Sequence, residues 1–132
     1  MAGTLKFLQV NLENSKLAQN LLWQFVAERG IHVVIASEYY NVTGVQGWYT
    51  DRTGLAAIGV CPECPIAPGE VESGEGYVAV KMADMVVYSC YFSPNRPFPE
   101  YEDFLNKLEE SLSRRQGEKF IVAGDFNAWS EE

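Results

Sequence analysis

The stretch IVAGDFN, from Ile121 to Asn127, joins three apolar residues to a glycine, an aspartate, a phenylalanine and an asparagine. A short apolar run that ends in turn-forming residues is typical of a buried strand. Asp125 and Asn127 follow this run directly. The C-terminal end of a buried strand is where an α/β protein usually carries its chemistry. We therefore predict that this strand delivers two polar side chains to a functional site.

The beginning of the chain predicts a β-α-β unit. Residues 5–10, LKFLQV, and residues 31–36, IHVVIA, are apolar runs suited to buried strands. Between them, apolar side chains recur at helical spacing, and Gly30 is suited to end that helix. A β-α-β unit implies parallel strands. Asn11 and Glu38 follow the two strands, so we expect them at the same edge of one sheet.

The rest of the chain predicts more strands, in antiparallel or mixed pairing, and a second helix. The expected strands are residues 48–50, 54–60, 77–82, 85–92 and 119–123, and the expected helix begins near Pro99 and runs to about Leu112. Residues 61–76 are rich in proline and glycine and are expected to form a loop. With no repeat or linker, residues 1–132 form one domain of the α/β class.

The composition is that of a globular protein with an acidic balance. Hydrophobic residues make up 47% of the chain and charged residues 21%, which excludes a disordered chain. Ten basic and eighteen acidic residues give a net charge of −8. This balance argues against binding nucleic acid by charge alone, yet it is compatible with carboxylates that hold a divalent metal. No apolar run has the length of a membrane span, and we expect a nuclear or cytoplasmic protein without a membrane partner.

Cysteine and histidine do not predict a site of their own. Cys61 and Cys64 form a C-x-x-C pair, but no second pair exists to complete four zinc ligands. With Cys90 the count of cysteines is three, which argues against a disulfide framework. We interpret the pair as incidental thiols in a surface loop. His32, the one histidine, lies inside a strand-like run and is interpreted as structural.

Several stretches together resemble one known family. They are LKFLQVNLENSKLAQNLL, VVIASEYY, DRTGLAAIGV, VYSCYFSPN and IVAGDFNAW. They are similar to the endonuclease/exonuclease/phosphatase family, which includes DNase I-like and apurinic-endonuclease-like enzymes. Within it the likeness is to the endonuclease domain of non-LTR retrotransposons, particularly insect elements. The resemblance runs over essentially the whole chain. It implies a DNase I-like two-sheet α/β sandwich, of which residues 1–132 are the N-terminal portion and the C-terminal portion is absent.

The same resemblance implies a role for each polar residue at a strand end. Asn11 is expected beside the metal and the scissile phosphate, and Glu38 is expected to bind the metal. Tyr91 looks like the tyrosine that holds the phosphate. Asp125 looks like the aspartate that orients or deprotonates the attacking water, and Asn127 like its phosphate-binding neighbour. The metal is Mg²⁺ or Mn²⁺, a hard cation that prefers oxygen ligands and keeps several waters.

Weaker expectations concern loop residues. Arg52 and Arg96 are candidates for contacts with DNA phosphates, and solvated arginines are the alternative. Tyr39, Tyr40 and Trp48 are suited to stacking on bases, although aromatic residues in this section are more often part of a core.

The function that the resemblance implies is Mg²⁺-dependent nicking of target DNA, in a polypeptide that also carries a reverse transcriptase domain. Family members have an aspartate-histidine pair beyond the part matched here, so we expect this fragment alone to be inactive. Two alternatives stay open: a phosphoesterase of the same fold with another substrate, and a non-catalytic remnant or interaction fragment. A flavodoxin-like binding domain is disfavoured because residues 11–14 contain no glycine for a phosphate loop.

Overall fold

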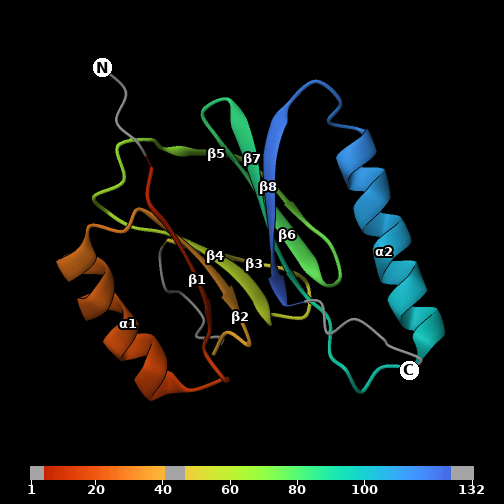
Figure 1. The fold of residues 1–132 in the computed structure, drawn as a ribbon, viewed down its shortest axis with the longest axis horizontal. Helices are drawn as coiled ribbons and strands as arrows, with labels where there is room; N and C mark the ends of the chain where they lie inside the picture. The colour runs from red at the N-terminus through yellow and green to blue at the C-terminus, as the bar shows by residue number, and fades with distance from the viewer. Residues whose placement is uncertain (1–4, 41–46, 126–132) are drawn as a thin grey trace.

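Two four-stranded sheets pack face to face, and one helix covers each outer face (Figure 1). The computed structural model describes residues 5–40 and 47–125. The strands are β1 (Phe7–Asn11), β2 (Val33–Ser37), β3 (Trp48–Thr50), β4 (Ala56–Val60), β5 (Pro68–Ser73), β6 (Tyr77–Met82), β7 (Met85–Tyr91) and β8 (Lys119–Asp125). The helices are α1 (Lys16–Arg29) and α2 (Phe98–Ser113). In the described ranges neither helix is long and apolar enough to cross a membrane.

The first sheet, sheet A, has the strand order β1-β2-β4-β3. β1 and β2 are parallel, with Asn11 opposite Ser37, which confirms the predicted β-α-β unit. The second sheet, sheet B, has the order β5-β6-β7-β8. β7 and β8 are parallel, with Tyr91 opposite Asp125, whereas β6 and β7 form an antiparallel hairpin. Both sheets are therefore mixed.

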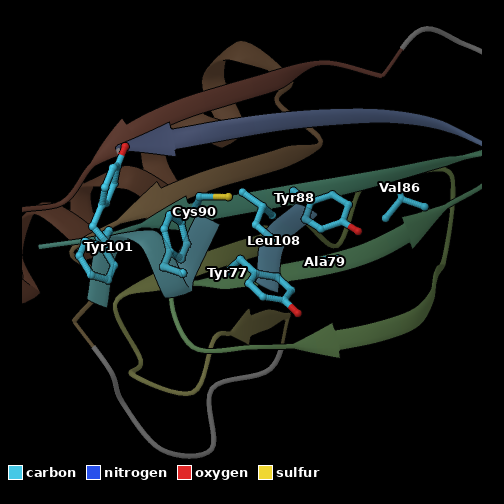
Figure 2. Close-up of a cluster of buried hydrophobic side chains, with 9 residues drawn as sticks. Tyr77, Ala79, Val86, Tyr88, Cys90, Tyr101 and Leu108 are labelled. Carbon is cyan, nitrogen blue, oxygen red and sulfur yellow. The ribbon is translucent and has the colours of Figure 1, made fainter. Parts of the chain in front are cut away.

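Three apolar layers hold the sandwich together. The layer between the sheets contains Val33, Ile35, Ile58, Val78, Val80, Met82 and Val87. A second layer joins α1 to sheet A, and a third joins α2 to sheet B. Figure 2 shows the third layer, where side chains of β6, β7 and α2 gather. β2 is covered on both faces, since its five residues are all buried, as its apolar run predicts.

Both ends of α1 are capped, and its C-terminal end is the one that the sequence predicts. Ser15 caps its N-terminus, with the hydroxyl accepting a hydrogen bond from the Ala18 N–H at 3.1 Å. Gly30 ends the helix in the left-handed region, with φ 66°. The helix thereby returns the chain to the start of β2, parallel to β1.

β5 corrects the prediction of an unbroken loop over residues 61–76. Its sequence, PGEVES, combines proline, glycine and two glutamates, all poor strand formers. β5 forms nevertheless because it lies at the edge of sheet B and pairs with β6 alone. At an edge, exposed charges are tolerated and proline need not donate to a partner. A register shift between Pro68 and Val71 also fits this irregular sequence.

A polar cluster fastens α2 to sheet B through Glu72 of β5. The Glu72 carboxylate accepts hydrogen bonds from Tyr77, Ser111, Arg114 and Arg115 at 2.7 to 3.0 Å. Burial alone would raise the pKa of Glu72, but the hydrogen bonds from Tyr77, Arg115 and Ser111 together hold it below its ordinary value. Glu72 is therefore an ionised anchor between the edge strand and the helix.

Candidate active site

Four of the predicted residues lie at one end of the sandwich. Asn11 ends β1 and Glu38 follows β2, both in sheet A. Tyr91 ends β7 and Asp125 ends β8, both in sheet B. The expectation that Asn11 and Glu38 lie at the same edge of one sheet is confirmed, and the second, facing sheet contributes the other two residues. The parallel pairs β1–β2 and β7–β8 each carry their polar residues at the carboxyl end.

Hydrogen bonds join the two sheets near these residues. The Gln9 amide in β1 donates to the Gly124 carbonyl in β8 at 3.2 Å. The Ser89 hydroxyl in β7 donates to the Ala36 carbonyl in β2 at 3.2 Å, and Ser89 is fully buried. Each bond lies one or two residues before a candidate site residue. The separation of the two halves of the site is therefore set by direct contacts.

In sheet A, Asn11 and Glu38 form a direct pair. Asn11 Nδ2 donates to Glu38 Oε2 at 2.7 Å, while Asn11 Oδ1 accepts the Glu13 N–H at 2.7 Å. Both ends of the amide are thereby fixed. Glu13, Asn14 and Glu38 all have φ 52°, a region that non-glycine residues seldom occupy. The Asn14 N–H donates to the Glu38 carbonyl at 2.7 Å, which joins the two strained turns.

In sheet B, Tyr91 faces both carboxylates of the site. Burial, and after it the negative charges of Glu38 and Asp125, raise the pKa of Tyr91 above its ordinary value. A hydrogen bond with Ser93 acts in the opposite direction. The phenol is therefore neutral at physiological pH and has a proton to donate. Its response to both carboxylates indicates that the two halves of the site converge.

Gly124, which sequence reasoning did not single out, sets the position of Asp125. Its φ is 136°, and a Cβ there would lie 2.0 Å from the Cys90 carbonyl oxygen. Only glycine allows β8 to approach β7 this closely just before Asp125. The glycine of the GDFN motif was the available signal. Glycine is therefore required at position 124 for the packing of β8 against β7 and not for a chemical role.

A second residue that sequence reasoning missed is Asp51, in the turn between β3 and β4. Its side chain is buried, with 4% exposed. The carboxylate accepts hydrogen bonds from the Thr53 hydroxyl and from the backbone N–H groups of Gly54, Leu55, Ala56 and Gly76. The sequence Asp-Arg-Thr-Gly is typical of a turn organised by an aspartate, which was the available signal.

The predicted DNA-contacting arginines have different surroundings. Arg52 is exposed, and its N–H donates to the Gly74 carbonyl at 2.8 Å. Arg96 forms ion pairs with Glu75 and Glu100, and its guanidinium lies 5.2 Å from the centre of the Phe92 ring. Two acidic side chains thus compete with any phosphate for Arg96. Asn127 lies outside the described residues.

The aromatic residues proposed for base stacking belong mainly to the core beside α1. Tyr39 is buried, and its ring centre lies 4.7 Å from that of Trp48. Trp48 also packs against Trp23 of α1, at 5.4 Å between ring centres. The backbone of Tyr40 exchanges two hydrogen bonds with the Gln19 amide, at 3.0 Å each. These contacts anchor the segment that follows Glu38.

The donor set fits a magnesium ion. In the described ranges no three His, Cys, Asp or Glu side chains come close enough together to hold a metal. Mg²⁺ does not need such a cage, because it binds through one or two carboxylates and keeps waters and substrate phosphates as its other ligands. Glu38 and Asp125 provide two carboxylates, and both act electrostatically on Tyr91. Hard oxygen ligands of this kind favour Mg²⁺ or Mn²⁺ over zinc.

A cavity lies at the end of sheet A that is opposite to Glu38. It encloses about 640 Å³ and is lined by residues such as Trp23, His32 and Cys61. His32 precedes β2 and Cys61 follows β4, so the cavity and Glu38 lie at opposite ends of β2. The Nδ1 atom of His32 accepts the Lys6 N–H at 3.0 Å, in keeping with a structural histidine.

The prediction that Cys61 and Cys64 are incidental thiols in a surface loop is wrong for Cys61. Cys61 is buried in the layer beneath α1, so its thiol is part of the core. Burial, with a smaller effect of Cys64, raises the pKa of Cys61 to about 11. Cys64 is half-buried, and its thiol donates to the Ile66 carbonyl at 3.3 Å. Both cysteines are free.

Comparison with solved structures identifies the fold. The endonuclease domain of TRAS1, a telomere-specific non-LTR retrotransposon, aligns over 96% of this chain with a TM-score of 0.76 and 24% identity. An AP endonuclease from Archaeoglobus fulgidus aligns over 95%, with a TM-score of 0.70 and 16% identity. A humanized D. rerio TDP2 aligns over 96%, with a TM-score of 0.61 and 13% identity. The chain therefore has the DNase I-like fold of these proteins, as the resemblance implied.

The match covers only part of each solved structure. The chain spans 61% of the TRAS1 domain, 58% of the archaeal enzyme and 63% of TDP2. No protein-family model matches the sequence, and a search of curated proteins finds no match either.

Proposed function

We propose that this chain is the N-terminal portion of a Mg²⁺-dependent DNA endonuclease that cleaves a phosphodiester bond. In the intact protein it nicks target DNA and leaves an end for a reverse transcriptase domain of the same polypeptide. The protein works on DNA inside the cell, in the nucleus or the cytoplasm. The DNase I-like fold that the chain shares with the TRAS1 endonuclease domain supports this proposal.

The observation that carries the proposal is the meeting of four polar side chains from two sheets. The Asn11–Glu38 pair comes from sheet A, and Tyr91 with Asp125 comes from sheet B. The hydrogen bonds Gln9–Gly124 and Ser89–Ala36, each one or two residues before these side chains, join the two sheets and support their convergence. The negative charges of Glu38 and Asp125 both act on Tyr91, which also supports a shared site at the carboxyl ends of the four strands.

Each side chain has a role that suits its chemistry. Glu38 holds the metal, and Asn11 fixes the orientation of the Glu38 carboxylate through the 2.7 Å hydrogen bond. The neutral Tyr91 phenol donates a hydrogen bond to a phosphate oxygen. Asp125 orients the attacking water and accepts its proton. Asn127 binds the phosphate beside Asp125. When bound, Mg²⁺ polarises the phosphoryl oxygen and stabilises charge on the leaving oxygen.

The 132-residue chain alone is expected to be inactive. It spans 61% of the TRAS1 domain, so the proposed activity belongs to a protein that provides the remaining part of the fold. The acid–base group that the family resemblance places in that part contributes roughly 10²–10⁴-fold to the rate. Metal binding at Glu38, in contrast, uses residues that this chain already contains.

A plasmid-nicking experiment tests the proposal. The longest polypeptide encoded by the gene is incubated with supercoiled plasmid and Mg²⁺, and conversion to open circles is measured. Glu38→Ala and Asp125→Ala are each expected to lower the rate at least about 10²-fold. Glu109→Ala is the matched control, because Glu109 is an exposed acid on α2, which packs on the outer face of sheet B. If the Glu38 and Asp125 variants nick at the parent's rate, the proposed site is wrong.

A further inference from the structure

We infer that Asp51 is a positioning residue of this site, because its one carboxylate fixes the backbone beside Glu38 to the backbone of Tyr91. The positioning role rests on the proposed function, but the hydrogen bonds of Asp51 can be tested without measuring catalysis. Asp51 lies in sheet A's β3–β4 turn and contacts neither Glu38 nor Tyr91 through its own side chain. It acts instead through the backbones of two residues, Leu55 and Gly76.

The first link connects Asp51 to the segment that carries Glu38. Asp51 Oδ1 accepts the Leu55 N–H at 3.1 Å. The carbonyl of the same Leu55 accepts the Tyr39 N–H at 3.2 Å, and Tyr39 directly follows Glu38. The left-handed turn at Glu38 is therefore fixed on its C-terminal side by the Asp51 turn.

The second link crosses to the other sheet. Asp51 Oδ2 accepts the Gly76 N–H at 2.7 Å, from the turn between β5 and β6. The Gly76 carbonyl accepts the Tyr91 N–H at 2.9 Å. Gly76 has φ 96°, and a Cβ there would lie 2.6 Å from the Phe104 ring. Only glycine therefore fits here, and its two hydrogen bonds hold it between Asp51 and Tyr91.

The burial of Asp51 supports a positioning role. A carboxylate with 4% exposure is costly to bury unless its oxygens are satisfied. Here four backbone N–H groups and the Thr53 hydroxyl satisfy them. A turn within sheet A alone needs only the Oδ1 bonds. The Oδ2 bond to Gly76 connects this turn to sheet B, in which Tyr91, the proposed phosphate-binding residue, ends β7.

The two oxygens allow the links to be separated by substitution. In Asp51→Asn, the oxygen stays on the side that faces three backbone N–H groups, so the Leu55 link is kept. The amide NH₂ then faces the Gly76 N–H and cannot accept its hydrogen bond. Asp51→Ala removes both links. Thr53→Val is the control for the Gly76 link. It removes the bonds from the Thr53 hydroxyl to Asp51 and one of the two acceptors of the Leu55 N–H, but it leaves the Gly76 N–H bonded to Oδ2.

The experiment uses NMR on the 132-residue chain, without metal or DNA. Amide exchange is measured for Leu55, Gly76 and Tyr91. In Asp51→Asn we expect Gly76 and Tyr91 to exchange at least about tenfold faster, with Leu55 unchanged. Thr53→Val should leave the exchange rates of Gly76 and Tyr91 unchanged.

A matching kinetic result is expected in the full polypeptide. Asp51→Asn should lower kcat for plasmid nicking about 10–100-fold, with KM for DNA changed far less, because misplaced groups lose rate rather than binding. If Asp51→Asn lowers only the melting temperature and leaves the exchange rates of Gly76 and Tyr91 unchanged, the inference is overturned. If these NMR changes occur but the parent never nicks DNA, the proposed function fails and the positioning geometry stands.

A second measurement avoids any dependence on the folding of the variants. Couplings across hydrogen bonds are measured in the unsubstituted chain, from the Gly76 nitrogen to the Asp51 carboxyl carbon and from the Tyr91 nitrogen to the Gly76 carbonyl carbon. Both couplings are expected. The absence of either one from a folded chain would contradict the proposed link.

Discussion

The Asn11 amide donates to the Glu38 carboxylate at 2.7 Å, and this bond joins two residues that are 27 positions apart in the sequence. It forms because β1 and β2 are parallel and end side by side, with α1 as the connection between them. The other end of the amide accepts the Glu13 N–H. Asn11 therefore sets the direction of the one carboxylate that we propose as the principal metal ligand.

The first prediction concerns this pair. Asn11→Ala should weaken Mn²⁺ binding by the 132-residue chain about 10–100-fold, because a group that orients a metal ligand typically has an effect of that size. The measurement is titration calorimetry. Asn20→Ala, at an exposed position of α1, is the control and should bind Mn²⁺ normally. Equal affinity of the two variants would show that Asn11 does not orient Glu38.

A second prediction concerns the glycine before Asp125. Gly124→Ala should destabilise the fold by about 3 kcal/mol or more, because its Cβ would overlap the Cys90 backbone. Gly117 is a matched control. It also has a positive φ, 89°, but a Cβ there meets no atom within 4 Å. Gly117→Ala should cost about 1–2 kcal/mol. Urea unfolding measures both, and equal losses would show that the close approach of β7 and β8 is not required.

A third prediction concerns Glu72 and pH. Its pKa is lowered on folding, so its ionised form stabilises the fold above the unfolded pKa of about 4.3. That contribution disappears as pH falls through the folded pKa. Glu72→Gln should therefore cost about 2 kcal/mol at pH 7 and much less near pH 3. Glu70→Gln, exposed on the same strand, should cost little at either pH. A loss for Glu72→Gln that is independent of pH would contradict this role.

The fourth prediction concerns the thiols. Burial raises the pKa of Cys61 to about 11 and, with a smaller effect of Asp51, that of Cys90 to about 12. Both thiols are therefore protonated at pH 8 and should react slowly with a thiol reagent. The half-buried Cys64 should react first. In denaturant all three should react together. Fast native labelling of Cys90 would show that β7 is not buried as described.

Much of the fold could be predicted because hydrophobic periodicity is strong where both faces of an element are covered. The runs that became β2, β6 and β7 are mainly apolar and were predicted to within two residues at each end. β5 was missed because an edge strand has one partner and can carry exposed glutamates. Its pairing depends on β6, which lies later in the chain, so local sequence does not reveal it.

The candidate site was only partly predictable, for a different physical reason. The residue types at the strand ends, Asn11, Glu38, Tyr91 and Asp125, were visible in the sequence. Their assembly across two sheets was not, because periodicity indicates strands but not how sheets face one another. Asp51 was missed since its importance lies in hydrogen bonds to Leu55 and to the distant Gly76.

The most direct test of the proposed active site is a Mn²⁺ titration of the isotope-labelled 132-residue chain, followed by NMR. A bound paramagnetic ion broadens the signals of nearby nuclei. The strongest broadening is predicted at Asn11, Glu38, Tyr91 and Asp125, and Glu38→Gln should remove it. Broadening centred on the opposite end of sheet A, around Glu63, or broadening that persists in Glu38→Gln, would contradict a metal site between the two sheets.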